Sequence, residues 1–314
     1  MLEYQKEFEM EVPFGTIRGK IWHHPDRTVD NCTERIIALH GWQDNCGTFD
    51  ALLPLLSDDL YVVAIDFSGH GLSSHLPAGC SYNDTVFVIE IERIVQYLSW
   101  KDLQFSFLGH SMGAAIAMFY ACLYPKSVKK LIALDMIKPL TFPSEMLAEK
   151  TREGIQQFLQ LEAKTSINNC LAINDLSNVP LYDYNEAMSR LIASHSIFGK
   201  ITEEGAKLLM KRGLKQSPNH LDKFYFTRDN RLKAILFLRM DFEALMHYFN
   251  ELSCELLIIK AQNGLKLDSD EISDRYIELY RTKCPRFDII TVPGGHHVHL
   301  CDPGIVHDKI NNFF

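Results

Sequence analysis

The sequence predicts an α/β fold in which a mostly parallel β-sheet is covered by helices on both faces. Short, continuously apolar runs recur along the chain, as expected for strands that are buried on both faces. Segments with the apolar spacing of amphipathic helices lie between these runs. This alternation is interrupted once, by a long polar segment at 136–240, and then resumes. A segment inserted between two strands of one sheet is typical of a cap over the sheet edge, so we expect a core of 1–135 and 241–314 and a helical cap of 136–240.

The first expected elements are two strands joined by a tight turn at Pro13-Phe14-Gly15, which together read as an opening hairpin. Apolar runs then indicate five strands of the parallel sheet, and one more run ends it. In order, the expected strands are Phe8–Val12, Thr16–Trp22, Arg35–Leu39, Tyr61–Ile65, Leu103–Leu108, Val128–Leu134, Leu256–Lys260 and Phe287–Val292.

Helical spacing of apolar residues is found at Thr48–Leu56, Tyr82–Leu98 and Met112–Tyr124, and Gly304–Phe314 is expected to be the closing helix. The inserted segment is rich in aromatic residues, among them Phe198, and we expect helices without a buried strand there. An ordinary run of packing helices is the alternative interpretation of this segment.

Composition excludes several classes of protein. The chain has 314 residues and a formal net charge of −8, which argues against a nucleic-acid partner because the phosphate backbone would be repelled. No stretch approaches the 18 apolar residues of a transmembrane helix. The eight cysteines form no Cys-x-x-Cys pair, which is typical of reduced thiols. With a polar start and no peroxisomal signal, we expect a cytoplasmic protein; association with peroxisomes or vesicles through partner proteins stays open.

A pentapeptide of the form Gly-x-Ser-x-Gly, Gly109-His110-Ser111-Met112-Gly113, lies between an expected strand and an expected helix. This context is that of a nucleophile elbow. The tight turn forces unusual backbone angles on the serine, and the small flanking glycines avoid clashes. We therefore expect Ser111 to be a nucleophile, with the backbone N–H of Met112 beside it at a helix N-terminus.

A serine hydroxyl needs a base to take its proton, and the best candidate is His296, after the last expected strand. A metal site is the competing interpretation, because His296, His297, His299 and Cys301 are bunched. We expect no metal and no cofactor, since the sequence offers no second ligand cluster of comparable quality.

Acyl transfer also needs a second N–H that faces the developing negative charge. The segment Leu39-His40-Gly41-Trp42 follows a buried strand, which is the right place for such a loop. We expect the N–H of Trp42 to be this donor. The side chain of His40 is expected to be structural, and Asp66 to be a turn former.

These motifs resemble the α/β-hydrolase superfamily along nearly the whole chain, and in finer detail the serine hydrolase-like proteins of animals. The resemblance implies an eight-stranded sheet with a helical cap and an ester hydrolase activity, but it does not imply a substrate. It also places the catalytic histidine seven residues before a proline, which favours His296, seven before Pro303, over His297. The matching residues are Leu39-His40-Gly41-Trp42-Gln43-Asp44-Asn45, Asp66-Phe67-Ser68-Gly69-His70-Gly71-Leu72-Ser73, Gly109-His110-Ser111-Met112-Gly113, Arg228-Asp229-Asn230-Arg231-Leu232 and Gly295-His296.

The acidic partner of the histidine is where the sequence departs from the family pattern. Most members carry it just after the strand that follows the cap, where this chain has Asn263-Gly264. Asp135, at the end of Val128–Leu134, is favoured because a strand end fixes a carboxylate well. Asp268, further along the later loop, is the alternative. If neither acts, the site is a slower Ser–His dyad.

The sequence therefore predicts a serine hydrolase that cleaves a small, apolar carboxylic ester through an acyl-enzyme on Ser111. Two alternatives stay open. One is a catalytically weak relative that binds a small ligand, since fold does not settle function. The other is a carbon–carbon bond hydrolase, which would use the same set of residues.

Overall fold

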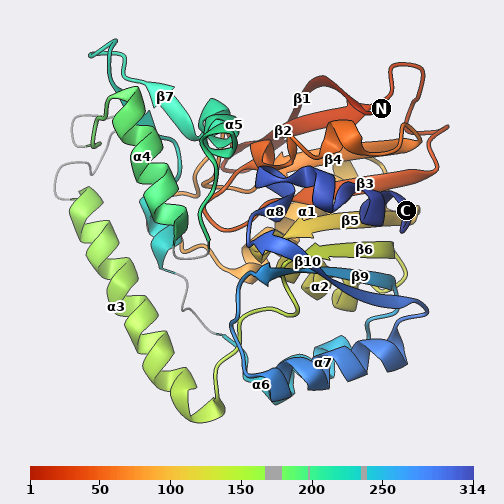
Figure 1. Ribbon diagram of the computed structural model, residues 1–314. Coiled ribbons are helices and arrows are strands. Elements are labelled where there is room, and N and C mark those ends of the chain that lie inside the picture. Colours follow the sequence, from red (N-terminus) through yellow and green to blue (C-terminus); the bar gives the residue numbers. More distant parts are fainter. Residues whose placement is uncertain (167–178, 197–198, 235–238) are drawn as a thin grey trace.

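The protein is described by a computed structural model that covers residues 1–166, 179–196, 199–234 and 239–314 (Figure 1). Cys170 and Phe198 lie outside the described residues. The other seven cysteines are free thiols. Among the described residues, no helix combines the length and the apolar character needed to cross a bilayer.

Eight strands form one mixed sheet in the order β1-β2-β4-β3-β5-β6-β9-β10. β1 pairs antiparallel with β2, and β2 pairs antiparallel with β4, whereas every other pair in the sheet is parallel. The predicted mostly parallel, eight-stranded sheet is therefore confirmed. The strands are β1 (Glu3–Val12), β2 (Gly15–His23), β3 (Glu34–Leu39), β4 (Leu60–Asp66), β5 (Phe105–His110), β6 (Val128–Leu134), β9 (Glu255–Asn263) and β10 (Phe287–Gly295).

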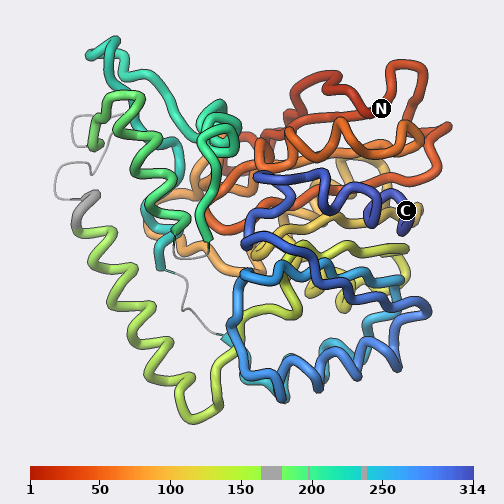
Figure 2. The backbone as a smooth tube through the Cα atoms, in the orientation of Figure 1, coloured from red at the N-terminus to blue at the C-terminus, as the bar shows by residue number. Residues whose placement is uncertain are grey.

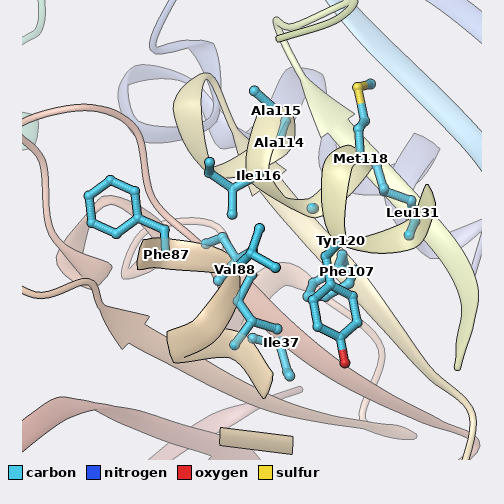
Figure 3. Packing of buried hydrophobic residues seen from close by; sticks show 14 of the residues in the cluster. Ile37, Phe87, Val88, Phe107, Ala114, Ala115, Ile116, Met118, Tyr120 and Leu131 are labelled. Atoms are coloured by element: carbon cyan, nitrogen blue, oxygen red, sulfur yellow. The ribbon is translucent and has the colours of Figure 1, made fainter. Parts of the chain in front are cut away.

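Helices cover both faces of this sheet, because each strand of the parallel part is apolar on both sides. On one face, α1 (Asp84–Tyr97), α2 (Met112–Leu123), α6 (Phe242–Phe249) and α7 (Asp270–Lys283) pack into one apolar cluster. Figure 3 shows side chains of α1 and α2, such as Val88 and Ile116, facing Ile37 of the sheet.

The other face is covered by shorter elements, which bury residues such as Phe49, Leu53 and Ile310 against the sheet. These elements are the 3₁₀ helices η1 (Cys46–Phe49), η2 (Leu53–Leu55) and η6 (Pro303–Ile305), with α8 (Val298–Cys301) and α9 (His307–Asn311).

The chain between β6 and α6 forms a separate group of elements, coloured green to cyan beside the sheet in Figures 1 and 2. A small apolar cluster of its own joins α4 to α5 and includes Leu300 of α8, which ties the group to the core. That 136–240 is a cap domain stays a prediction. The elements are η3 (Ser144–Met146), α3 (Leu147–Ser166), α4 (Tyr184–His195), α5 (Glu203–Gly213), β7 (Leu214–Gln216), β8 (Phe224–Phe226) and η5 (Asn230–Lys233).

Two local predictions were wrong. Thr48–Leu56 is not one α-helix but two 3₁₀ helices, because Pro54 has no N–H to donate to the carbonyl four residues earlier and its ring clashes there. The closing segment starts as a 3₁₀ turn, so its α-helix is limited to His307–Asn311. Besides its helices, the inserted segment contains β7 and β8, which pair in a small antiparallel sheet that the aromatic run Phe224–Phe226 favours, and neither of these strands is buried. The helix α7 was not predicted from the sequence.

Candidate active site

Ser111 lies between the end of β5 and the start of α2, in a strained backbone conformation. Its φ of 50° and ψ of −119° place it where non-glycine residues are uncommon. The side chain is buried, with 8% of the residue exposed, and it lines a cavity at this end of the sheet. Strain of this kind persists only where the surrounding structure imposes it.

The two glycines of the pentapeptide impose that conformation by letting backbone segments approach closely. A Cβ on Gly113 would lie 2.1 Å from the carbonyl oxygen of Leu39, and one on Gly109 would lie 2.5 Å from Cα of Ala114. Neither position can hold a larger residue without moving the turn. The glycines therefore fix where α2 leaves the sheet and where Ser111 points.

Two backbone N–H groups lie near this turn. Met112 is the first residue of α2, so its N–H has no acceptor within the helix. The loop that carries Trp42 is also close, since a Cβ on Gly41 would lie 3.3 Å from Cβ of Ser111. Gln43, with φ of 61°, has the left-handed backbone conformation typical of a turn. Trp42 and Met112 thus both line the cavity beside Ser111.

The structure joins His296 to Asp135, and both are buried. Nδ1 of His296 donates to Oδ2 of Asp135 over 2.6 Å. The carboxylate also accepts two backbone N–H groups, from Ala261 and Leu265, each over 2.8 Å. A carboxylate with three donors has little freedom to rotate, so it can hold one orientation of the imidazole ring.

Gly264 leaves room for the carboxylate of Asp135. A Cβ on residue 264 would lie 2.2 Å from Oδ2 of Asp135, because the carboxylate occupies the space above the glycine. The Asn263-Gly264 segment therefore receives the carboxylate from the neighbouring strand end.

Asp268, the alternative acid, is engaged elsewhere. Its carboxylate forms an ion pair of 2.9 Å with Nζ of Lys138, whose side chain is buried. Lys138 also donates to the hydroxyl of Thr141 over 2.8 Å. A buried ammonium needs such partners, so the role of Asp268 here is to pair with Lys138.

The other residues that the sequence singled out around the site are structural. Nε2 of His40 accepts the N–H of Phe67 over 3.1 Å, and its Nδ1 faces the carbonyl of Gly41. Asp66 accepts the N–H of Leu72 in its turn and pairs with Arg212 over 2.9 Å.

A cavity of about 1120 Å³, part of it open to solvent, extends from Ser111 and His296 to the inserted segment. Much of its wall is apolar, contributed both by α2 and by the inserted segment. Such a wall favours a ligand with an apolar part next to a polar reacting group. The apolar lining includes Met112, Ile116, Met136, Leu140, Leu232 and Leu265.

A second buried carboxylate, Asp44, lies in the same cavity wall and was missed by the sequence analysis as a site residue. Its Oδ1 accepts from Nε2 of His195 over 2.8 Å, and its Oδ2 lies 3.5 Å from Nε2 of His297. Although burial alone would raise it, the hydrogen bond from His195 and the nearby ring of His297 hold the pKa of Asp44 well below its usual range. Burial works against the charge on His195 as well, yet its hydrogen bond to Asp44 raises the pKa of His195.

No local signal marks this cluster, because its residues come from three distant parts of the chain. Of the closely spaced histidines near residue 297, only His297 belongs to this cluster, together with Asp44 and His195. His299 instead faces the hydroxyl of Thr48 over 2.9 Å and lies outside the cluster.

Comparisons with known proteins agree with the fold. Residues 34–195 match the family described as alpha/beta hydrolase fold. A "Probable serine hydrolase" of Drosophila melanogaster is 34% identical over 98% of this chain and 87% of its own length. "Serine hydrolase-like protein 2" of Homo sapiens is also 34% identical, over 98% of this chain and 93% of its own.

A solved structure of a hypothetical protein from Pseudomonas aeruginosa superposes with a TM-score of 0.78 at 28% identity, covering 98% of this chain and 97% of that one.

Proposed function

The chain belongs to the α/β-hydrolase fold family, and on that premise we propose that it is a serine hydrolase that cleaves a small, apolar carboxylic ester. It resembles the serine hydrolase-like proteins of animals along nearly its whole length. Both the ester specificity and the acyl-enzyme on Ser111 are parts of this proposal.

The observation that carries the proposal is the 2.6 Å hydrogen bond from His296, which lines the cavity together with Ser111, to Asp135. A histidine held in this way carries its proton on Nδ1. Nε2 then presents a lone pair and can act as a base. It supports an enzyme over a binding protein, because a receptor would not need an oriented base.

In the proposed reaction, Nε2 of His296 takes the proton of the Ser111 hydroxyl as its oxygen attacks the ester carbonyl. The N–H groups of Trp42 and Met112 stabilise the oxyanion, each contributing about 3 kcal/mol to the transition state. The alcohol leaves with the proton from His296, and a water activated by the same residue then releases the acid. Asp135 stabilises the charged imidazole without accepting its proton.

The apolar cavity wall supports an ester with an apolar acyl or alcohol part. Met136, Leu140 and Leu232 belong to the inserted segment, so we propose that this segment acts as the cap and sets specificity. A cytoplasmic location stays a prediction.

The test is labelling with a fluorophosphonate probe, followed by hydrolysis of p-nitrophenyl esters of increasing acyl length. We expect the wild type to be labelled and Ser111→Ala to be unlabelled, with turnover about 10⁶-fold lower. Folding of the variant is checked by thermal melting. A folded wild type that neither reacts with the probe nor hydrolyses any ester would contradict the proposal and favour a ligand-binding role.

A further inference from the structure

We propose that Asp44, His195 and His297 form a binding site for a divalent transition metal ion of the zinc class, in the cavity wall next to Ser111. The site is distinct from the catalytic residues and goes beyond the proposed function. Each of the three residues offers one ligand atom, and these atoms all lie within 4.8 Å of one another. All three line the cavity.

The unusual feature of the cluster is a buried carboxylate oxygen without a hydrogen bond. Within the described part of the chain, Oδ2 of Asp44 has no hydrogen-bond partner, although the residue is only 2% exposed. It lies 3.5 Å from Nε2 of His297 and 3.7 Å from Nδ1 of His110. A buried charged oxygen left in this state is rare and indicates an ion or a water that bridges the groups.

The separation of Oδ2 from His297 suits an ion. Two ligands bound to one tetrahedral zinc at about 2.1 Å lie about 3.4 Å apart. This is longer than a hydrogen bond and close to the 3.5 Å between Asp44 and His297. The ion would replace the direct contact of 2.8 Å between Asp44 and His195, with a small movement of the His195 ring.

The orientation of His195 fits the role of a ligand. Its Nδ1 lies 2.9 Å from the carbonyl oxygen of Leu191, which can only accept, so Nδ1 carries a proton. Metal-binding histidines usually donate their second N–H to a carbonyl or carboxylate in this way. Nε2, which donates to Asp44 in the metal-free protein, is directed toward the cluster, and loss of its proton when an ion binds would expose the lone pair that serves as the ligand.

Two imidazoles and one carboxylate select the class of ion. Imidazole nitrogen suits zinc, cobalt, nickel and copper, whereas magnesium and calcium need a shell of oxygens. Three protein ligands also leave at least one coordination position open. Since the residues line the cavity, that position would face the space proposed for the substrate and would take a water or an oxygen of the ligand.

The first test is titration of the chelator-treated wild type with Co²⁺. Co²⁺ bound at this site gives a visible d–d absorption that saturates at one ion per chain. A thiolate charge-transfer band must be absent, since the cysteines are the competing ligands. Ser111→Ala should bind the ion as the wild type does, which separates this proposal from the hydrolase proposal.

The variants Asp44→Asn and His195→Gln should weaken Co²⁺ binding at least ~100-fold, because the first removes the negative charge of the site and the second removes an imidazole ligand. The matched control is His299→Gln, which changes a buried histidine of the same segment outside the cluster and should keep the affinity. Thermal melting without metal shows which variants fold. X-ray absorption of the zinc-loaded wild type, with two imidazoles and oxygen expected, is decisive even if a variant does not fold.

The proposal is overturned if the wild type binds no Co²⁺ at stoichiometric concentration, if a thiolate band appears, or if both ligand variants fold and bind as tightly as the wild type. The first result would leave a bridging water as the partner of Asp44.

Discussion

Asp135 and Asp44 are both 2% exposed, and both face a histidine of the segment that follows β10, yet they are held in different ways. Asp135 receives two backbone N–H groups besides His296, and its distances are 2.6–2.8 Å. Asp44 faces imidazole rings. Its Oδ2 lies 3.5 Å from Nε2 of His297 and 3.7 Å from Nδ1 of His110.

This difference suggests how two adjacent histidines, His296 and His297, can have separate roles. A carboxylate fixed by backbone donors is suited to orienting one ring, because those donors move only with the sheet. A carboxylate among side chains can adjust its partners by rotamer changes. The proposed roles, orientation at Asp135 and ion binding at Asp44, follow from this contrast.

The largest effect should come from removing the charge at the oriented carboxylate. We expect Asp135→Asn to lower kcat about 10⁴-fold, because an amide no longer holds the imidazole in the required tautomer. Asp44→Asn should have a much smaller effect on kcat in metal-free buffer. Steady-state kinetics on one ester measures both. If kcat fell further in Asp44→Asn than in Asp135→Asn, Asp44 rather than Asp135 would be the acid that orients the catalytic histidine.

The control for that prediction is Asp268→Asn, which should change kcat little because the carboxylate pairs with Lys138. A loss in Asp268→Asn as large as that expected for Asp135→Asn would move the acid to the later loop.

A smaller effect should come from crowding the oriented carboxylate without removing it. In Gly264→Ala the new Cβ would lie 2.2 Å from Oδ2 of Asp135 and would push the carboxylate away from His296. We expect kcat to fall about 10²-fold, the usual result of a displacement of about 1 Å in a catalytic group. Gly304→Ala, whose nearest contact would be 3.6 Å, is the control. Equal activity in both variants would mean that Asp135 need not be held closely.

The third prediction concerns His70, whose Nδ1 contacts the carbonyl oxygen of Ser68 rather than a carboxylate. Burial, with the nearby His40, lowers the pKa of His70 to about 3. The unfolded chain therefore binds a proton below pH 6.5 that the folded chain does not, so stability is lost as the pH falls through this range. From pH 7.5 to pH 5, His70 should lower the free energy of unfolding by about 2 kcal/mol.

Urea unfolding of the wild type and His70→Gln at these two pH values measures the contribution. The variant should lose less stability on acidification, and an equal loss in both proteins would rule out His70 as a source.

The fold was predictable because its signals are local. The apolar runs that became β3 to β6 and β9 record burial on both faces, and Ser111 lies between a strand and a helix that are adjacent in sequence. Asp135 was favoured over Asp268 on the argument that a strand end fixes a carboxylate, and the structure places it 2.6 Å from His296. Its catalytic role stays a prediction.

What the sequence could not predict depends on contacts between distant residues. Asp44 and His195 are 151 residues apart, and no periodicity links a loop after β3 to the end of α4. The α-helix expected at Thr48–Leu56 does not form for a local reason, because Pro54 lies within the apolar spacing that predicts it.

The position of Asp135 also bears on how such sites change during evolution. β6 and β9 are adjacent parallel strands, with Leu134 opposite Ile259, so a carboxylate after either strand can reach the same histidine. An evolving chain can pass through an intermediate with an acid after each of the two strands and then lose one of them. The loop after β9 must then have a glycine where the carboxylate from β6 needs space. In this chain Asn263 occupies the place where most members of the family carry the acid, and the carboxylate that contacts His296 comes instead from the end of the neighbouring strand.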